Sequence, residues 1–541
     1  MNQIYIYDTT LRDGAQREGL SLSVEDKIQI AQRLDRLGVG FIEGGWPGAN
    51  PKDVEFFQQL PPLTNAELVP FCMTRRTGIK ANADPMLVPI LGAGTKWITI
   101  VGKSWDLHVR ESLRVSLDEN LSMITDTISY LRSRDRRIIY DAEHWFDGYK
   151  YNSEYAIATL KTALAAGAEW LVLCDTNGGT LPQDVSKIVA AVKLELGDVK
   201  LGIHPHDDAG VAVANAIAAV EAGATMVQGT INGYGERCGN ANLCTVIPNL
   251  QLKMGKQCVS SDQLTKITEI SRQVSEIVNL APDDHAAYVG ISAFAHKGGM
   301  HVSAVQRNPI TYEHTAPEGV GNTRRIVISE QAGLSNVLSK AASFGIKLQK
   351  DDQACRQILQ KIKELEQVGY QFEAAEASFE LLMLEAIAQR PKFFTLSGFQ
   401  VHCDQVNCDQ VHCDLNMEQK APALATVKVI VKDQEKLTAA EGNGPVAALD
   451  SALRKALVEF YPAIAQFSLT DYKVRILNSN CGTKATTRVL IESTNGDRRW
   501  TTLGVSSNII DASYQALAEG LEYGLILETN LARALSPGFR T

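Results

Sequence analysis

Two histidines stand two positions apart in the segment GIHPHDDAG, which spans residues 202–210. Side chains at i and i+2 of a strand point to the same face, so His204 and His206 could bind one metal ion together. The intervening Pro205 is tolerated where a strand ends. A hydrogen-bonded pair of loop histidines is the structural alternative. The segment therefore indicates part of a metal site, whose other ligands must come from elsewhere in the chain.

A second segment rich in potential ligands, VHCDQVNCDQVHCD at 401–414, competes with the first. It repeats a five-residue unit and offers five donors, Cys403, Cys408, Cys413, His402 and His412. Their spacing matches no compact zinc motif. We expect a duplicated insert in an exposed loop between strands, with adventitious metal binding as the alternative.

Eight short apolar runs alternate with longer helical patterns in the first half of the chain. The runs cover residues 4–8, 41–45, 68–73, 97–101, 137–143, 170–175, 201–206 and 226–231. Eight strand–helix units in roughly 250 residues are typical of a (β/α)8 TIM barrel. An open, doubly wound sheet is the alternative, but eight repeats favour closure.

The first helical pattern shows how such a unit is delimited. Ser23 begins it, and Asp26 three residues later completes a variant of the capping box. Gly38 is suited to end it, because glycine tolerates the left-handed conformation found after helices. Apolar residues at 28, 31, 34 and 37 predict one buried stripe.

Polar residues cluster where the predicted strands end, which is where a barrel places its catalytic groups. They are Arg12, Asp13, Glu43, Lys103, Glu143, His144, Asp175, Thr176, Asn177, His204, His206, Glu236, Arg237 and Asn240. In a closed barrel the seventh strand lies close to the first, so Asp13 and Asn240 could join the two histidines. A set of nitrogen and oxygen donors without sulfur fits Mg²⁺, Mn²⁺, Co²⁺ or an open Zn²⁺ site. A 2-keto acid could chelate such an ion, which would then polarise the keto group.

The rest of the chain changes character twice. Residues 261–395 are predicted to be mostly helical, apart from a Gly- and His-rich loop at 290–315. From 396 onward, strands at 425–432 and 471–479 and helices at 444–457 and 506–521 predict a small α/β domain with a weak internal duplication. The predicted domains are a catalytic barrel, helical linker subdomains and a C-terminal regulatory domain, at 1–258, 259–395 and 396–541.

Composition limits the function classes. The 541 residues are 45% hydrophobic and 21% charged, with a net charge of −9 and no basic block, so a small-molecule substrate is favoured over nucleic acid. No apolar run is long enough to cross a membrane, and the N-terminus does not resemble a signal peptide. Scattered cysteines indicate reduced thiols, and we expect a cytoplasmic protein.

Four motifs together resemble a known family. YDTTLRDGAQREG, HPHDDAG, GYGERCGN and HKGGMH are similar to motifs of the metal-dependent Claisen-condensing synthases of 2-isopropylmalate, homocitrate and citramalate. The resemblance covers essentially the whole chain. The segments at 44–53, 142–150 and 174–180 look most like the citramalate-forming branch. That branch implies condensation of acetyl-CoA with pyruvate and water, releasing CoA, on a route to isoleucine.

The resemblance also implies roles for individual residues. Asp13, His204, His206 and Asn240 would bind the metal ion, most naturally Mg²⁺ or Mn²⁺. Arg12 would bind substrate and stabilise charge on the keto oxygen, and Thr176 would hold substrate or a water molecule. His301, with Glu143 and Tyr312, would remove a proton from the acetyl methyl group. The family often has an acidic residue two places after this histidine, where this chain has Ser303.

For the C-terminal domain, the resemblance implies a homodimer and inhibition by an end-product amino acid, expected to be isoleucine. Three alternatives stay open at this point. They are 2-isopropylmalate synthesis, a lyase or biotin-dependent carboxyltransferase on a similar barrel, and a non-catalytic amino-acid sensor. The complete Arg12, Asp13, His204 and His206 set argues against the last.

Overall fold

The computed structural model describes residues 3–329, 332–403 and 423–535. The chain divides into two compact units, Met1–Phe294 with Glu313–Arg324, and Ala295–Tyr312 with Arg325–Thr541. No helix in the described ranges is both long and apolar enough to span a membrane. The described cysteines are free thiols.

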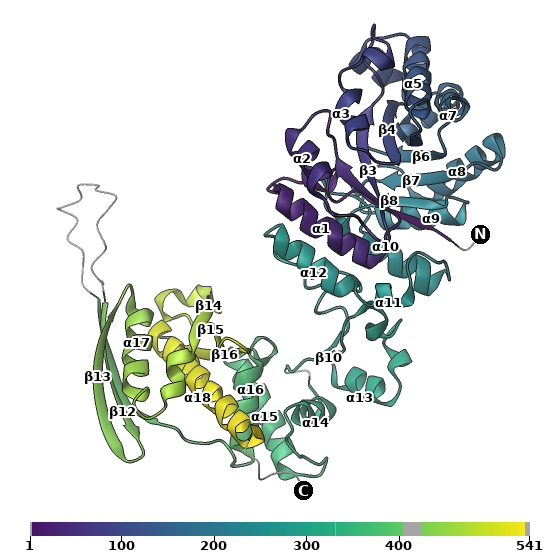
Figure 1. Cartoon of the computed structure of the whole chain (residues 1–541). Coiled ribbons are helices and arrows are strands. Elements are labelled where there is room, and N and C mark those ends of the chain that lie inside the picture. The colour runs from purple at the N-terminus through teal and green to yellow at the C-terminus, as the bar shows by residue number, and fades with distance from the viewer. Residues whose placement is uncertain (1–2, 330–331, 404–422, 536–541) are drawn as a thin grey trace, which may run out of the picture. The chain divides into compact units, whose positions relative to one another are not determined.

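The first unit is a closed barrel of eight parallel strands (Figure 1). The strands are β1 (Tyr5–Asp8), β2 (Phe41–Gly45), β3 (Glu67–Met73), β4 (Trp97–Lys103), β5 (Arg137–Glu143), β6 (Trp170–Asp175), β7 (Leu201–Pro205) and β8 (Met226–Gly229). β8 pairs with β1, with Ile6 opposite Val227, which closes the barrel and excludes the open sheet. The predicted (β/α)8 fold is confirmed.

Helices follow the strands and surround the barrel (Figure 1). The longer ones are α1 (Val24–Leu37), α2 (Pro51–Gln59), α5 (Leu117–Arg132), α7 (Ser153–Ala166), α8 (Pro182–Leu196), α9 (Ala212–Glu221) and α12 (Ile267–Ile277). Most of them bury an apolar face against the barrel. The buried side chains of these helices and the outward-facing residues of the strands form one continuous hydrophobic core.

Helix α1 confirms the predicted capping. Ser23 and Asp26 form a reciprocal capping box, and Gly38 ends the helix in the left-handed region with φ 84°. The predicted stripe is partly wrong, because Ile28 is only half-buried whereas Ile30 is buried. Lys27 is buried as well, because it forms an ion pair with Asp53 of α2 and donates to the Gly44 carbonyl.

The second unit begins with the helical region, and one prediction there is wrong. The Gly- and His-rich segment at 290–315 is not all loop, because α13 (Gly299–Arg307) runs through it. The glycines lie at its first turn, where Gly298 is the extended N-cap, and Val302 and Val305 provide a buried face. The other helices are α14 (Leu334–Ser343), α15 (Gln353–Gln367) and α16 (Glu376–Ala386).

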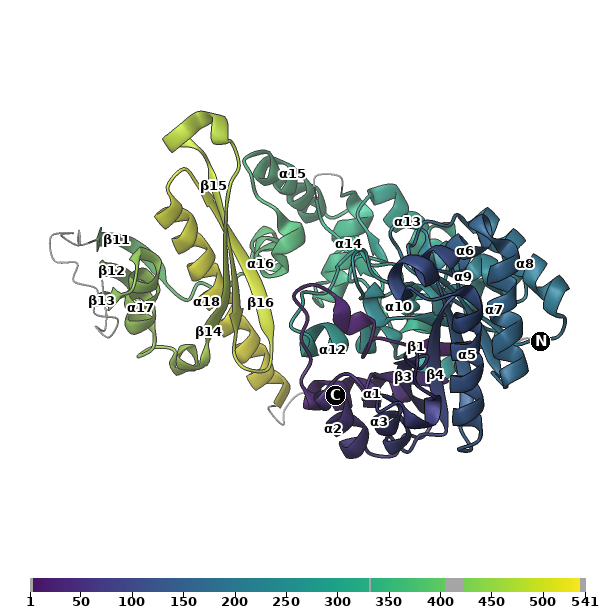
Figure 2. The same ribbon diagram turned by 90° about the horizontal axis from the view of Figure 1, so that it is seen from above.

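Two similar βββα modules complete the second unit. The first comprises β11 (Thr395–Cys403), β12 (Ala423–Val431), β13 (Gln434–Gly442) and α17 (Pro445–Leu457); the second comprises β14 (Ser468–Ile476), β15 (Thr487–Thr494), β16 (Arg499–Ser506) and α18 (Ile509–Leu535). Both sheets are antiparallel, and Figure 2 shows α18 lying along the second sheet. The predicted duplication therefore has three strands per module where one was expected.

The competing ligand segment begins with the last residues of β11. His402 and Cys403 are exposed there and pair with Leu424 and Ala423 of β12. Cys408, His412 and Cys413 lie outside the described residues.

Candidate metal centre and barrel mouth

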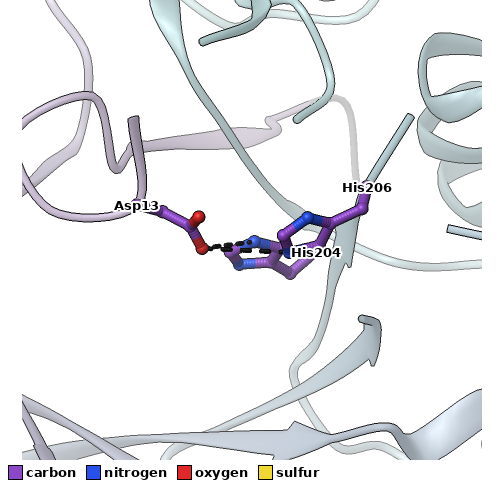
Figure 3. A group of neighbouring side chains, drawn as sticks. All are labelled: Asp13, His204 and His206. Carbon is purple, nitrogen blue, oxygen red and sulfur yellow. Dashed lines mark ion pairs between the residues drawn. The ribbon is translucent and has the colours of Figure 1, made fainter. Parts of the chain in front are cut away.

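Asp13, His204 and His206 meet at the carboxyl-terminal end of the barrel. All three are buried, and their ligand atoms lie within 4.8 Å of one another. Asp13 Oδ2 is 3.3 Å from His204 Nε2 and 3.9 Å from His206 Nε2, and the two imidazole rings are stacked beside the carboxylate (Figure 3). His204 lies on β7 and His206 directly follows it, and their spacing together with closure through β8 brings these residues together, as the sequence predicted.

Asn240 joins the cluster from the loop after β8. Its Oδ1 lies 2.8 Å from His204 Nε2, and its Nδ2 donates to Asp13 Oδ1 at 3.3 Å. The loop must fold tightly to bring it there. Gly239 has φ 94°, and a Cβ at this position would overlap the Gly233 carbonyl oxygen. The glycines of GYGERCGN therefore serve the placement of Asn240.

The electrostatics of the metal-free cluster suit a cation. Burial alone would raise the pKa of Asp13, but the charge of Arg12 and the hydrogen bond from His204 hold it well below its usual range. Burial alone would lower the pKa of His204, but Asp13 outweighs it and raises this pKa to about 9. Burial and the nearby His204 lower the pKa of His206 to about 4. The centre thus holds one carboxylate, one neutral imidazole and one imidazole whose proton a metal ion would replace.

These donors fit a divalent ion. One carboxylate, two imidazoles and an amide oxygen are nitrogen and oxygen ligands, and they leave coordination positions for substrate. A second group, Asp141, Cys174 and His204, also has ligand atoms within 4.8 Å. It suits a metal ion poorly, because burial raises the pKa of the Cys174 thiol and His204 Nδ1 is occupied by Gln228.

Arg12 is held rigidly beside the centre. Its Nε donates to Glu43 Oε2 at 2.6 Å and its Nη1 to Asp13 Oδ2 at 3.1 Å. Its guanidinium carbon lies 4.0 Å from the centre of the Phe71 ring. In the described part of the chain, Nη2 has no hydrogen-bond partner. Arg12 therefore retains a donor that a bound oxygen could use.

Glu43 anchors Arg12 from inside the barrel. This fully buried carboxylate also accepts hydrogen bonds from Tyr7 at 2.7 Å and from Thr9 at 2.5 Å. With Arg12, these donors satisfy an acid that burial would otherwise penalise.

Glu143 and Thr176 lie at the ends of β5 and β6. Glu143 forms an ion pair with Lys103 of β4. Glu143 and Lys103 line a cavity of about 540 Å³, whose wall also includes Met73, Met86 and Leu113. Thr176 Oγ1 accepts a hydrogen bond from the His144 backbone N–H at 2.9 Å, and its carbonyl accepts one from Arg237 at 2.6 Å. The mouth thus contains an acid, a hydroxyl and an apolar-lined space.

His301 and Tyr312 belong to the second unit. The structure brings them together, with ring centres 4.2 Å apart, and leaves both side chains exposed. His301 projects from the first turn of α13, which is the helix missed in the sequence. Ser303 lies on the same helix.

Sequence reasoning missed two residues that form hydrogen bonds behind the candidate metal ligands. Gln228 Oε1 lies 2.6 Å from His204 Nδ1, and Gln228 Nε2 donates to Asp141 Oδ1 at 2.9 Å. The sequence contained a signal for them, because Gln228 and Asp141 are polar residues within apolar runs that form the buried strands β8 and β5.

Comparisons with known proteins agree with this geometry. Residues 3–274 match the HMGL-like family, 288–369 the homocitrate synthase post-HMGL domain-like family and 373–525 the LeuA allosteric (dimerisation) domain. An (R)-citramalate synthase of Synechocystis sp. is 66% identical over 97% of both chains. One from Geobacter sulfurreducens is 52% identical over 97% of this chain and 98% of the relative.

One relative with a different named activity is less similar. A 2-isopropylmalate synthase of Methanocaldococcus jannaschii is 31% identical over 96% of this chain and 94% of its own. Identity to the two citramalate synthases above is much higher over similar coverage. The chain therefore belongs to the family of (R)-citramalate synthases, which are transferase enzymes.

Proposed function

We propose that this enzyme condenses acetyl-CoA with pyruvate and water to give (R)-citramalate and CoA, in isoleucine biosynthesis. The full-length identity of 66% to an (R)-citramalate synthase carries this proposal. The barrel mouth supports it chemically, because it contains a candidate cation centre and an arginine with a spare donor, and a cavity lined by Glu143 and Lys103 offers space for a small substrate.

In this proposal, Asp13, His204, His206 and Asn240 hold a divalent ion, most naturally Mg²⁺ or Mn²⁺, although Zn²⁺ and Co²⁺ are compatible with the donors. When bound, the ion supplies a Lewis acid that polarises the keto group of pyruvate. Thr176 positions pyruvate or a water molecule.

Arg12 stabilises the charge that develops during carbon–carbon bond formation. The methyl carbon of the acetyl group attacks the keto carbon, and the keto oxygen becomes negative before it takes up a proton. A fixed cation with a free N–H is suited to that oxygen. Because Glu43 and Asp13 already orient the guanidinium, it needs little reorganisation during the reaction.

His301 acts in removal of the methyl proton, with Glu143 and Tyr312 as partners. The contact between the His301 and Tyr312 rings supports a shared role. Water then hydrolyses the thioester, so the acyl carbon becomes a carboxylate and CoA leaves as its thiol.

The test measures the release of CoA while pyruvate and the divalent ion are omitted in turn. Purified enzyme is expected to release CoA from acetyl-CoA only when pyruvate and Mg²⁺ or Mn²⁺ are both present, and a chelator should stop the reaction. His204→Ala and His206→Ala should weaken metal binding in equilibrium dialysis. Deletion of residues 402–414 is the control and should leave metal affinity unchanged. If the deletion abolished metal binding and His204→Ala retained it, the metal site would lie in the Cys/His segment instead.

For the whole chain, we propose a catalytic barrel at 1–258, helical linker subdomains at 259–395 and a regulatory dimerisation domain at 396–541. The LeuA match and the two βββα modules support a homodimer with an allosteric domain. We propose isoleucine as its effector.

Truncation after residue 395 is expected to remove inhibition by isoleucine. It should also lower turnover, because the missing modules contribute to the dimer. Steady-state rates with and without isoleucine, together with the mass in solution, measure both effects. Leucine serves as the control effector for the full chain. Inhibition that persists after truncation would place the effector site outside the two modules.

A further inference from the structure

A buried chain of hydrogen bonds runs from Asp141 through Gln228 to His204. Asp141 belongs to β5, Gln228 to β8 and His204 to β7. Asp141 is 2% exposed, Gln228 0% and His204 3%, so water cannot replace any of these contacts. The two links measure 2.9 Å and 2.6 Å.

The direction of this chain follows from the orientation of the Gln228 amide. Its Nε2 donates to Asp141 Oδ1, so the NH₂ group of the amide faces Asp141. Its carbonyl oxygen then faces His204 and requires a proton on Nδ1. With the proton fixed on Nδ1, the lone pair of the neutral imidazole lies on Nε2, which is the atom beside Asp13 and Asn240.

We propose that Asp141 and Gln228 are positioning residues that set the tautomer of His204 for metal binding. The proposal rests on the metal centre of the proposed function. It goes further in assigning two interior residues that touch neither the substrate nor the ion. Outer partners of this kind typically change metal affinity by about 10–100-fold when they are altered.

The decisive variant is Asp141→Asn, which keeps the size of the side chain. The new amide can donate to the Gln228 oxygen, so the Gln228 amide can rotate and direct its NH₂ group toward His204. That arrangement favours a proton on Nε2 and blocks the lone pair needed by the ion. We expect the dissociation constant for Mn²⁺ to rise by about 10–100-fold.

Exchanging the carboxylate at 141 and the amide at 228 should restore Mn²⁺ binding. In the double variant Asp141→Asn with Gln228→Glu, the amide at 141 donates to the carboxylate at 228, which again accepts from His204 Nδ1. The total charge and the number of hydrogen bonds match those of the native chain. If the two residues served packing alone, the losses of Mn²⁺ affinity caused by the two substitutions would add. If they set the tautomer of His204, the second substitution restores the affinity lost through the first.

Mn²⁺ affinity is measured by electron paramagnetic resonance titration of the full chain, and folding by the Tm of the metal-free protein. Thr268→Val is the matched control, because it removes a buried hydrogen bond to the Val320 carbonyl, away from the metal centre. It should lower Tm without changing Mn²⁺ affinity. Native affinity in Asp141→Asn, or no recovery in the double variant, would overturn the proposal. If His204→Ala also binds Mn²⁺ normally, the metal centre itself is misplaced.

Discussion

Replacing Arg12 with lysine is expected to lower kcat on the order of 10²–10³-fold, which is the usual effect of losing one donor to a developing oxyanion. Arginine can hold Glu43 and Asp13 and still present Nη2, because its donors form a planar fork. Lysine has a single ammonium group, which would pair with Glu43 or Asp13 and leave the keto oxygen without a partner. Metal content should change less than kcat.

Steady-state kinetics and metal analysis of the same preparations check this result. Arg17→Lys is the matched control, because Arg17 lies exposed in the same loop and its guanidinium lies over the Tyr234 ring. Near-native kcat in Arg12→Lys would show that charge alone suffices. Loss of the ion in parallel with kcat would assign Arg12 to the metal centre instead.

The second large effect is expected for His301→Ala. Loss of a general base typically costs about 10²–10⁴-fold in rate. Because His301 lies outside the barrel unit, its loss should leave metal binding and pyruvate binding close to native. The specific readout is exchange of the acetyl methyl protons of acetyl-CoA with deuterated solvent. Oxalate can occupy the pyruvate site during this measurement, since it lacks an electrophilic ketone.

The native enzyme should exchange the methyl protons under these conditions, and His301→Ala should not. His285→Ala, which removes another exposed histidine, provides the control. Tyr312→Phe keeps the ring beside His301 and should slow exchange less than loss of the imidazole. Native exchange in His301→Ala would remove this residue from proton transfer and make Glu143 the next base to test.

The strands that position the site were predictable because parallel barrel strands are buried on both faces and appear as continuous apolar runs. The residues of the candidate metal centre were predictable for a related reason. His204 and His206 have strand spacing, and closure of the barrel brings the loop containing Asp13 close to them. The spacing of the two histidines and the closure of the barrel were therefore enough to predict where the candidate metal centre lies.

The hydrogen bonds that link Asp141 and Gln228 to His204 could not be derived in the same way. Gln228 is 87 positions from Asp141 and 24 from His204, so their contacts depend on strand register and side-chain rotamers. The half-exposed strands of the βββα modules were missed for another reason. β13 has the sequence QEKLTAAEG, whose single large apolar residue, Leu437, is 68% exposed. Such a strand is stabilised by its neighbours in the sheet and leaves little signal in the sequence.

The most direct test of the proposed function compares two keto acids. The value of kcat/KM for pyruvate should exceed that for 2-ketoisovalerate, which is larger by two methyl groups. Each extra carbon in a fitted pocket typically changes the preference by about 10–200-fold. CoA release is measured with both acids under identical metal and acetyl-CoA concentrations, and the chiral product is identified. A clear preference for pyruvate with (R)-citramalate as product is the predicted result, whereas a higher kcat/KM for 2-ketoisovalerate would contradict it.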